Sequence, residues 1–175
     1  MSGPEPHSAP LSPVEALARS HDLSRFDCGS HASLNDWLKR FAWVSQQSES
    51  SRTYVVHRAK RVVAYYSIAT GSAHREDAPP RVTKGLASHP VPIILLTRLA
   101  VDKAEQGAGL GKAMLKDALV RIAAAAKIVG VRTVLVHAID AQAAAFYRRF
   151  NFEPSPANDL HLMLLMKDLR MAMRQ

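Results

Sequence analysis

A short glycine-rich turn carries the clearest chemistry in this sequence. Residues 106–112 read Gln-Gly-Ala-Gly-Leu-Gly-Lys and lie between an apolar stretch and a long helical pattern. Glycine permits positive φ and lets a ligand approach the main chain closely. Successive N–H groups at the start of a helix then point into one concavity, where the helix dipole is positive. The turn is therefore predicted to bind a phosphate or pyrophosphate.

Two common phosphate-binding motifs do not fit this turn. A Walker A loop needs Ser or Thr after its lysine and a glycine six positions before it, but Ala113 follows Lys112 and Gln106 stands at the earlier position. A Rossmann fingerprint beginning at Gly107 and Gly109 needs its third glycine at position 112, but that residue is Lys112. A remaining alternative is that the turn is only a tight connection between two elements.

The elements that position the turn follow from hydrophobic periodicity. Residues 33–48 predict an amphipathic helix with Ser33 as N-cap, because apolar side chains recur there at three- and four-residue steps. The order of elements predicts a single α/β (α+β) domain with a mixed central sheet flanked by helices. After this first helix come strands 52–58 and 61–73 as a hairpin, a loop to 92, strand 93–101, the glycine turn, helix 110–129, strand 132–139, helix 141–150 and strand 160–167.

Composition sets the class of protein. The chain has 175 residues, 47% of them hydrophobic and 22% charged, as expected of one globular domain. Residues 1–13 are rich in Pro and Ser and predict a disordered tail, which leaves 14–175 for the domain. We expect no membrane span and no secretory signal. Because Cys28 is the single cysteine, no internal disulfide and no cysteine-based metal site are expected, and the chain suits a reducing cytoplasm.

The net charge points to an anionic partner. Lys and Arg number 23 against 15 Asp and Glu, which gives a formal net charge of +8. Such an excess favours nucleic acid, a phosphorylated cofactor or an acidic protein as partner. The alternative is a solvated basic surface that only keeps the protein in solution.

Together with its flanks, the turn resembles the pyrophosphate loop of the GNAT acetyltransferases, Q/R-x-x-G-x-G/A, through Gln106, Gly109 and Gly111. A strand ending in LAVD at 99–102 precedes it, and a further strand and a short helix containing AFYRRF follow the long helix. The resemblance extends from about Arg52 to the C-terminus. It implies the GNAT fold and an N-acetyltransferase that uses acetyl-CoA.

In GNAT enzymes an amine attacks the thioester of acetyl-CoA directly, and the resemblance assigns the cofactor contacts to two stretches. Main-chain groups of the strand would bind the acetyl group and pantetheine, and N–H groups of the turn would bind the pyrophosphate, with a lysine adding charge. The cofactor-binding residues so implied are Leu99, Ala100, Val101, Gln106, Gly107, Ala108, Gly109, Leu110, Gly111 and Lys112.

Tyr147 matches the tyrosine that protonates the departing sulfur in the family. The alternative is that the aromatic residues around it only pack the short helix against the sheet. We assign packing to Phe146 and Phe152 and the catalytic role to Tyr147. His137 is interpreted as a strand residue rather than a base, and Cys28 as structural.

The acceptor amine is constrained by what the central strand lacks. Residues 93–101 (IILLTRLAV) contain no Asp or Glu to serve as general base. A lysine ε-amine has a pKa near ~10.4 and must lose a proton, whereas an α-amine near ~7.7 is substantially neutral at cellular pH. The site therefore favours a low-pKa α-amine, unless a water chain or a base from elsewhere serves. Arg98 either binds a phosphate or RNA 3′-end, or forms an ion pair with a carboxylate such as Asp102 or Asp140.

Longer stretches resemble the acetyltransferase toxins of bacterial toxin–antitoxin modules, which acetylate the α-amine of aminoacyl-tRNA. The longest are FDCGSHASLNDWL at 26–38, RLAVDKAEQGAGLGKAMLKDAL at 98–119 and LVHAIDAQAAAFYRRFNFEPSP at 135–156. The resemblance implies a block of translation, a homodimer and a small ribbon-helix-helix antitoxin. Basic side chains would contact tRNA phosphates. The candidates are Lys39, Arg40, Arg52, Arg98, Arg148 and Arg149, with Arg58, Lys60 and Arg61 beside them.

Two other functions stay open at this point. One is acetylation of a protein N-terminus or of a small amine such as an antibiotic or polyamine, although a polyamine enzyme would usually need an acidic cleft. The other is a non-enzymatic module that keeps the fold and binds RNA or a partner. The intact glycine turn and Tyr147 argue against such a module.

Overall fold

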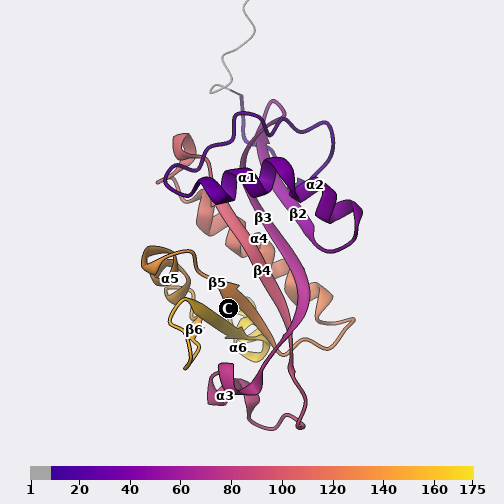
Figure 1. Ribbon diagram of the computed structural model, residues 1–175, viewed down its shortest axis with the longest axis vertical. Helices are drawn as coiled ribbons and strands as arrows, with labels where there is room; N and C mark the ends of the chain where they lie inside the picture. Colours follow the sequence, from indigo (N-terminus) through magenta and orange to yellow (C-terminus); the bar gives the residue numbers. More distant parts are fainter. Residues whose placement is uncertain (1–8) are drawn as a thin grey trace, which may run out of the picture. The chain divides into compact units, whose positions relative to one another are not determined.

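A seven-stranded mixed sheet with flanking helices forms the framework of the chain in the computed structural model, which describes residues 9–175 (Figure 1). The strands follow the order β1-β2-β3-β4-β5-β7-β6. The elements are β1 (Glu15–Ala16), α1 (Ala32–Arg40), α2 (Ala42–Gln47), β2 (Arg52–Arg58), β3 (Arg61–Ala73), η1 (Arg75–Asp77), α3 (Pro80–Thr83), β4 (Val91–Val101), η2 (Lys103–Glu105), α4 (Leu110–Ala125), β5 (Thr133–His137), α5 (Ala141–Arg148), β6 (Glu153–Pro154), β7 (His161–Leu165) and α6 (Met166–Met173). The predicted fold class is confirmed.

Two compact units make up the chain. The first contains the described residues up to Ile68 together with Arg98–Ala118, and the second contains Ala69–Thr97 and Leu119–Gln175. Strands β3 and β4 and helix α4 each run from one unit into the other.

The first unit begins with antiparallel strands. β1 pairs with β2, and β2 pairs with β3 through the predicted hairpin. The hairpin turn places Ala59 at φ 46° and Lys60 at φ 73°. Two successive positive φ values match a tight turn to the right-handed twist of the strands, which explains why a two-residue link suffices here.

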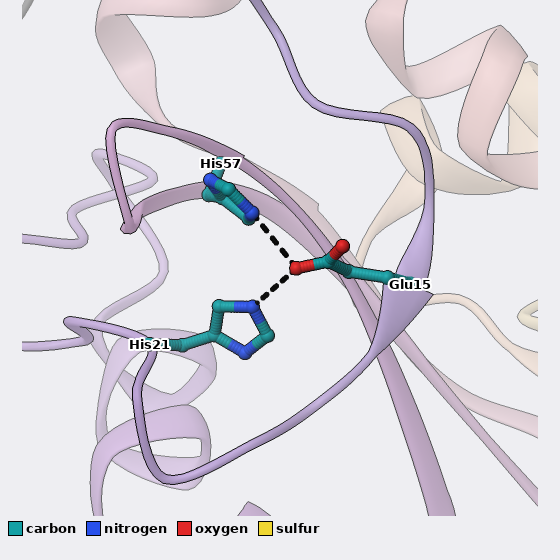
Figure 2. A group of neighbouring side chains, drawn as sticks. All are labelled: Glu15, His21 and His57. Atoms are coloured by element: carbon teal, nitrogen blue, oxygen red, sulfur yellow. Dashed lines mark hydrogen bonds and ion pairs between the residues drawn. The ribbon is translucent and has the colours of Figure 1, made fainter.

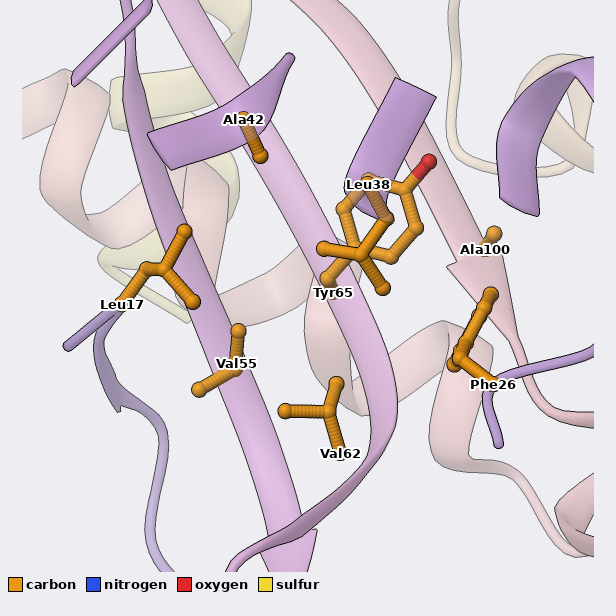
Figure 3. Packing of buried hydrophobic residues seen from close by; sticks show 8 residues of the cluster. All are labelled: Leu17, Phe26, Leu38, Ala42, Val55, Val62, Tyr65 and Ala100. Atoms are coloured by element: carbon orange, nitrogen blue, oxygen red, sulfur yellow. The ribbon is translucent and has the colours of Figure 1, made fainter. Parts of the chain in front are cut away.

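An apolar cluster holds α1 and α2 on these strands (Figure 3). Leu38 from α1 and Ala42 from α2 are fully buried against Val55 of β2 and Tyr65 of β3. The remaining members of the cluster are Leu17, Phe26, Val62 and Ala100. Burial of such side chains contributes roughly 25 cal/mol for each Å² of apolar surface removed from water.

The predicted helix over residues 33–48 is wrong as one helix. His31, not Ser33, is the N-cap, and the helix is interrupted at Phe41, whose φ of −120° leaves the helical range. The interruption lets α1 and α2 each bury a separate side chain. Phe41 and Val44, which the periodicity assigns to the buried face, are consequently 49% and 61% exposed.

The second unit contains the parallel part of the sheet. β4 pairs in parallel with β5, and β7 lies antiparallel between β5 and β6. The turn of helix α3 covers one end of the face formed by β4, β5 and β7, because Ala78 and Val82 pack with Ile93, Leu135 and Met163.

Several elements of the second unit differ from the sequence expectation. The predicted strand 160–167 ends at Leu165, and helix α6 follows it directly. The apolar residues continue from the strand into the helix, so hydrophobicity alone does not show where the strand ends. Met166 and Leu169 are buried three residues apart, as on a helix. The short strand β6 was not expected either. Helix α4 ends at Ala125 rather than 129, and the chain continues in turns.

Part of the predicted tail runs along the sheet. Residues 1–8 lie outside the described residues. In the remaining segment, Leu11 forms a bridge with Arg58, and the main-chain N–H of Ser12 donates to His57 at 2.8 Å. Across residues 9–175, no helix is long and apolar enough to cross a membrane.

Candidate active site

The glycine turn leads from β4 into α4 in the first unit. Gly107 and Gly109 both take positive φ, +86° and +85°, as the motif requires. The helical hydrogen-bond ladder starts with the N–H of Ala113 donating to the carbonyl of Gly109 at 3.1 Å. The N–H groups of Leu110, Gly111 and Lys112 precede that bond and are available to an anion, as at any helix start.

The side chain of Gln106 anchors the turn. Its Nε2 donates to the main-chain carbonyls of Cys28 and Val101, both at 2.9 Å. The amide thus ties the turn to the end of β4 and to the segment before α1. A glutamine suits this position because its two amide protons satisfy two carbonyls at once.

Asp102 fixes the point where β4 ends and the turn begins. Its buried carboxylate accepts the N–H groups of Asp27 at 3.1 Å and Ala104 at 3.0 Å and lies 3.6 Å from the guanidinium of Arg61. Its own N–H donates to the carbonyl of Val63 on β3 at 2.8 Å. These bonds attach the start of the turn to β3 and to the segment before α1.

Asp27 supports the same region from the segment before α1. Its carboxylate accepts from Lys103 Nζ at 2.9 Å, from the N–H of Gly29 at 2.9 Å and from Asn35 Nδ2 at 3.2 Å. The bond from Lys103, followed by that from Gly29, lowers the pKa of Asp27 to about 2. Sequence reasoning did not assign this role. The only signal for it was the stretch 26–38, which contains both Asp27 and Asn35.

The strand that was expected to contact acetyl and pantetheine separates from its neighbour. β4 pairs with β5 from Ile93 to Leu96, yet β4 continues to Val101. The assignment of Leu99, Ala100 and Val101 to cofactor binding concerns the part of β4 that lies beyond this pairing.

Tyr147 lies in the second unit, on α5. The side chain of Asp140 caps this helix by accepting the N–H of Ala143 at 2.8 Å. Tyr147 is 7% exposed and packs edge-on against Phe146 and Phe152, with ring centroids 5.2 and 5.5 Å away. Burial raises the pKa of its phenol above the ordinary range. The hydroxyl therefore stays protonated at neutral pH and can donate.

Arg98 makes a contact that the sequence did not predict. Its guanidinium lies 5.2 Å from the ring of Trp37, which in turn stacks on Tyr65.

The other basic residues fall into two groups. Arg58 and Arg61 each form an ion pair with a carboxylate. Arg58 pairs with Glu105 at 2.7 Å, and Arg61 pairs with Asp102 at 3.6 Å. Exposed basic side chains remain on α1 and at the end of α5, and two of their guanidinium groups lie over aromatic rings, Arg40 over Phe41 and Arg149 over Phe146. The exposed candidates for RNA contact are Lys39, Arg40, Arg52, Arg148 and Arg149, with Arg52 also 3.8 Å from Glu49.

Glu15, His21 and His57 bring three possible metal-ligating atoms within 4.8 Å of one another (Figure 2). Both Nε2 atoms contact the same Glu15 oxygen, at 2.7 and 2.8 Å. Each Nδ1 accepts a main-chain N–H, from Ala18 at 2.9 Å and from Lys60 at 3.2 Å. The ring protons must then sit on Nε2, in the place a metal would take. The cluster therefore fits a hydrogen-bonded tie between β1 and β2 rather than a metal site.

Known proteins resemble the chain along most of its length. The family profile described as Acetyltransferase (GNAT) domain matches residues 49–154. A tRNA-acetylating toxin of Mycobacterium tuberculosis is 46% identical over 170 residues, which are 97% of each chain. The structure of AtaT complexed with acetyl-methionyl-tRNAfMet has a TM-score of 0.85 at 27% identity, over 94% of this chain and 99% of that one. A tyrosine-to-phenylalanine variant of AtaT, bound to the C-terminus of its antitoxin AtaR and acetyl-CoA, has a TM-score of 0.80 at 27% identity, over 95% and 99%.

Proposed function

The chain belongs to the GNAT acetyltransferase family, and from that premise we propose that it is a toxin that acetylates the α-amine of aminoacyl-tRNA and so blocks translation. It is an acyltransferase, and acetyl-CoA is its acetyl donor. The observation that carries the proposal is the likeness to a tRNA-acetylating toxin over nearly the whole of both chains.

The first unit would hold the donor through its main chain. N–H groups from Gln106 to Lys112 bind the pyrophosphate, and main-chain groups of residues 99–101 bind the acetyl and pantetheine portion. Acetyl-CoA supplies a thioester whose acetyl carbon is open to attack by an amine. The buried bonds of Asp102 and the amide of Gln106 keep the N–H groups of the turn in place before the donor arrives. Such preorganisation lowers the cost of binding.

Tyr147 would be the acid of the reaction. As the amine nitrogen bonds to the acetyl carbon and the carbon–sulfur bond breaks, the phenol gives its proton to the leaving thiolate, and the amine proton passes to water. Its raised pKa keeps that proton available throughout the physiological range. No carboxylate on β4 is present to deprotonate the amine, which suits an α-amine that is already substantially neutral.

Basic side chains would bind the RNA part of the acceptor. The net charge of +8 attracts the phosphate backbone, and Arg98, Lys39, Arg40, Arg52, Arg148 and Arg149 are the proposed contacts. Affinity for tRNA should consequently fall steeply as salt rises.

The family likeness also supports a set of partners. We propose that the enzyme acts in the cytoplasm as a homodimer, with residues 14–175 as its GNAT domain, and that a ribbon-helix-helix antitoxin neutralises it. AtaT, a relative, has been solved with its antitoxin AtaR, which supports an antitoxin of some kind here.

Transfer of labelled acetyl from acetyl-CoA to total charged tRNA tests the proposal. Deacylated tRNA, bulk protein and small amines serve as control acceptors. We expect label on charged tRNA alone, released as an N-acetylated amino acid when the ester is hydrolysed. Label on protein N-termini or on small amines instead would retain the acetyltransferase and reject the tRNA-directed toxin.

A further inference from the structure

We propose that a cavity on the face of β4, β5 and β7 receives the side chain of the aminoacyl group and favours apolar side chains such as those of methionine and leucine. This inference rests on the proposed acetylation of aminoacyl-tRNA. It adds the property that the sequence does not indicate, namely which charged tRNAs are acceptors.

The cavity lies wholly within the second unit and measures about 260 Å³. Its floor is made by apolar side chains of three neighbouring strands: Ile93 and Leu95 of β4, Leu135 of β5 and Met163 of β7. These positions lie on one face of the sheet, since Leu95 pairs with Leu135 and Leu135 pairs with Met163.

Polar side chains also line the cavity, and one of them, Ser155, is buried. His137 and His161 stack with ring centroids 4.0 Å apart, and His74, Asp77 and Ser155 complete that side. A charged side chain placed against the apolar floor would lose its hydration there, which is unfavourable. An apolar side chain would instead remove the floor residues from water.

The cavity, of about 260 Å³, is large enough to receive a medium-sized side chain. The four side-chain heavy atoms of methionine, leucine or isoleucine fit against the apolar floor and leave room for water. Glycine would leave the floor empty and forgo that binding energy.

The cavity is placed beside the point where β4 and β5 part. Their pairing ends with Leu96 opposite Val136, and the cavity residues Leu95 and His137 directly adjoin that pair. In the proposed reaction the acetyl group contacts main-chain groups of residues 99–101, which follow further along β4. The other end of the same face is covered by Ala78 and Val82 around α3.

Gly71 of β3 offers a variant that fills the cavity without straining the fold. A Cβ atom there would meet Ile93 Cδ1 at 3.6 Å, an ordinary van der Waals contact, and the φ of Gly71 lies outside the left-handed range. Gly71→Val therefore adds methyl groups inside the cavity, and Gly71→Ala adds a smaller volume. Thr70→Val is the matched control, because Thr70 is the adjacent, exposed residue of the same strand and does not line the cavity.

The experiment compares kcat/KM for purified methionyl-, leucyl-, glycyl-, aspartyl- and lysyl-tRNA. We expect the unchanged enzyme to prefer the first two by about tenfold or more, the usual worth of one or two methylene groups in an apolar pocket. Gly71→Val should lower kcat/KM for methionyl- and leucyl-tRNA by about tenfold and for glycyl-tRNA by less than about twofold. Gly71→Ala should give a smaller change in the same direction, and Thr70→Val none.

The outcomes separate this inference from the proposed function. If the unchanged enzyme acetylates no charged tRNA, the proposed function fails and the inference fails with it. If it acetylates charged tRNA but prefers glycyl, aspartyl or lysyl forms, the cavity assignment alone is overturned. The same holds if Gly71→Val and Gly71→Ala lower all acceptors equally while acetyl-CoA binding and thermal stability are unchanged.

Discussion

The glycine turn and the cavity of the second unit are two sites built in opposite ways. The turn consists of consecutive residues and offers a ligand mainly main-chain N–H groups at the start of α4. The cavity is lined by side chains from β3, β4, β5 and β7 that are far apart in sequence. One site is defined by conformation and the other by side-chain shape.

This difference decides how each site responds to substitution. A main-chain site should tolerate changes of side chain but not of backbone conformation, because φ determines where the N–H groups point. A side-chain cavity should keep its backbone and change its preference gradually as volume is added or removed. Turn variants should therefore lose binding outright, whereas cavity variants such as Gly71→Val should redirect it.

Gly109→Val should show the largest effect, a loss of at least about a hundredfold in acetyl-CoA affinity, which corresponds to roughly 2.7 kcal/mol. Gly109 has φ +85°, a conformation that costs a β-branched residue heavily, although no atom lies within 4 Å of its added Cβ. Titration calorimetry with acetyl-CoA measures the loss.

Gly130→Val is the matched control for that variant. Gly130 also has open space around an added Cβ but is not in the left-handed region, so its variant should bind acetyl-CoA normally. Wild-type affinity in Gly109→Val would show that the pyrophosphate is held elsewhere.

Tyr147→Phe should come next, with kcat lower by roughly a hundredfold or more and acetyl-CoA affinity nearly unchanged, as for loss of a general acid. The ring stays and keeps its contacts with Phe146 and Phe152, so thermal stability should change little. Because burial raises the pKa of the phenol, the native enzyme should lose no activity through ionisation of Tyr147 as the pH rises to 10. Single-turnover rates across pH measure both effects, and equal kcat in the variant would remove Tyr147 from the mechanism.

Gln106→Ala tests whether the anchor of the turn matters as well as its glycines. The variant loses two hydrogen bonds, to Cys28 and Val101, so acetyl-CoA affinity should fall by about tenfold, or roughly 1.4 kcal/mol. Gln47→Ala, at the exposed end of α2, should leave that affinity unchanged. If Gln106→Ala also binds normally, the bonds of Asp102 suffice to hold the turn.

What the sequence could predict follows the same division. The turn, the hairpin at Ala59 and the succession of the main elements along the chain were predictable because each depends on local residue type and periodicity. The interruption at Phe41 was not predictable, because it depends on tertiary packing. Leu38 and Ala42 lie on two different helices, and both side chains pack into the same apolar cluster.

The residues that support the site could not be predicted from the sequence for a related reason. Asp27 contacts Lys103 across 76 positions of sequence, and no local pattern indicates that these two residues pair. The cavity likewise depends on strand register, because Leu95, Leu135 and Met163 share a face only through the pairings of β4, β5 and β7. The assignment of Tyr147 and of the RNA contacts stays a prediction that needs the measurements above.

Glu15→Gln should have the smallest effect on function among these variants. Glu15 joins β1 to β2 through His21 and His57, and neither the turn nor the cavity includes it. The bond from His21, then that from His57, lowers the pKa of Glu15, so the folded chain favours its ionised form. That stabilisation is present above about pH 4.5 and is lost as the pH falls through the lowered value. The variant should therefore unfold at a lower temperature than the native chain at pH 7, with the difference shrinking below pH 4, while acetyl-CoA affinity and kcat at pH 7 stay unchanged. Thermal unfolding at both pH values measures the difference.

Thermal unfolding with and without Zn²⁺ tests whether the cluster binds a metal. A cluster whose ring protons face the carboxylate should gain no stability from Zn²⁺. A Zn²⁺-dependent rise in the native chain that Glu15→Gln abolishes would instead identify a metal site.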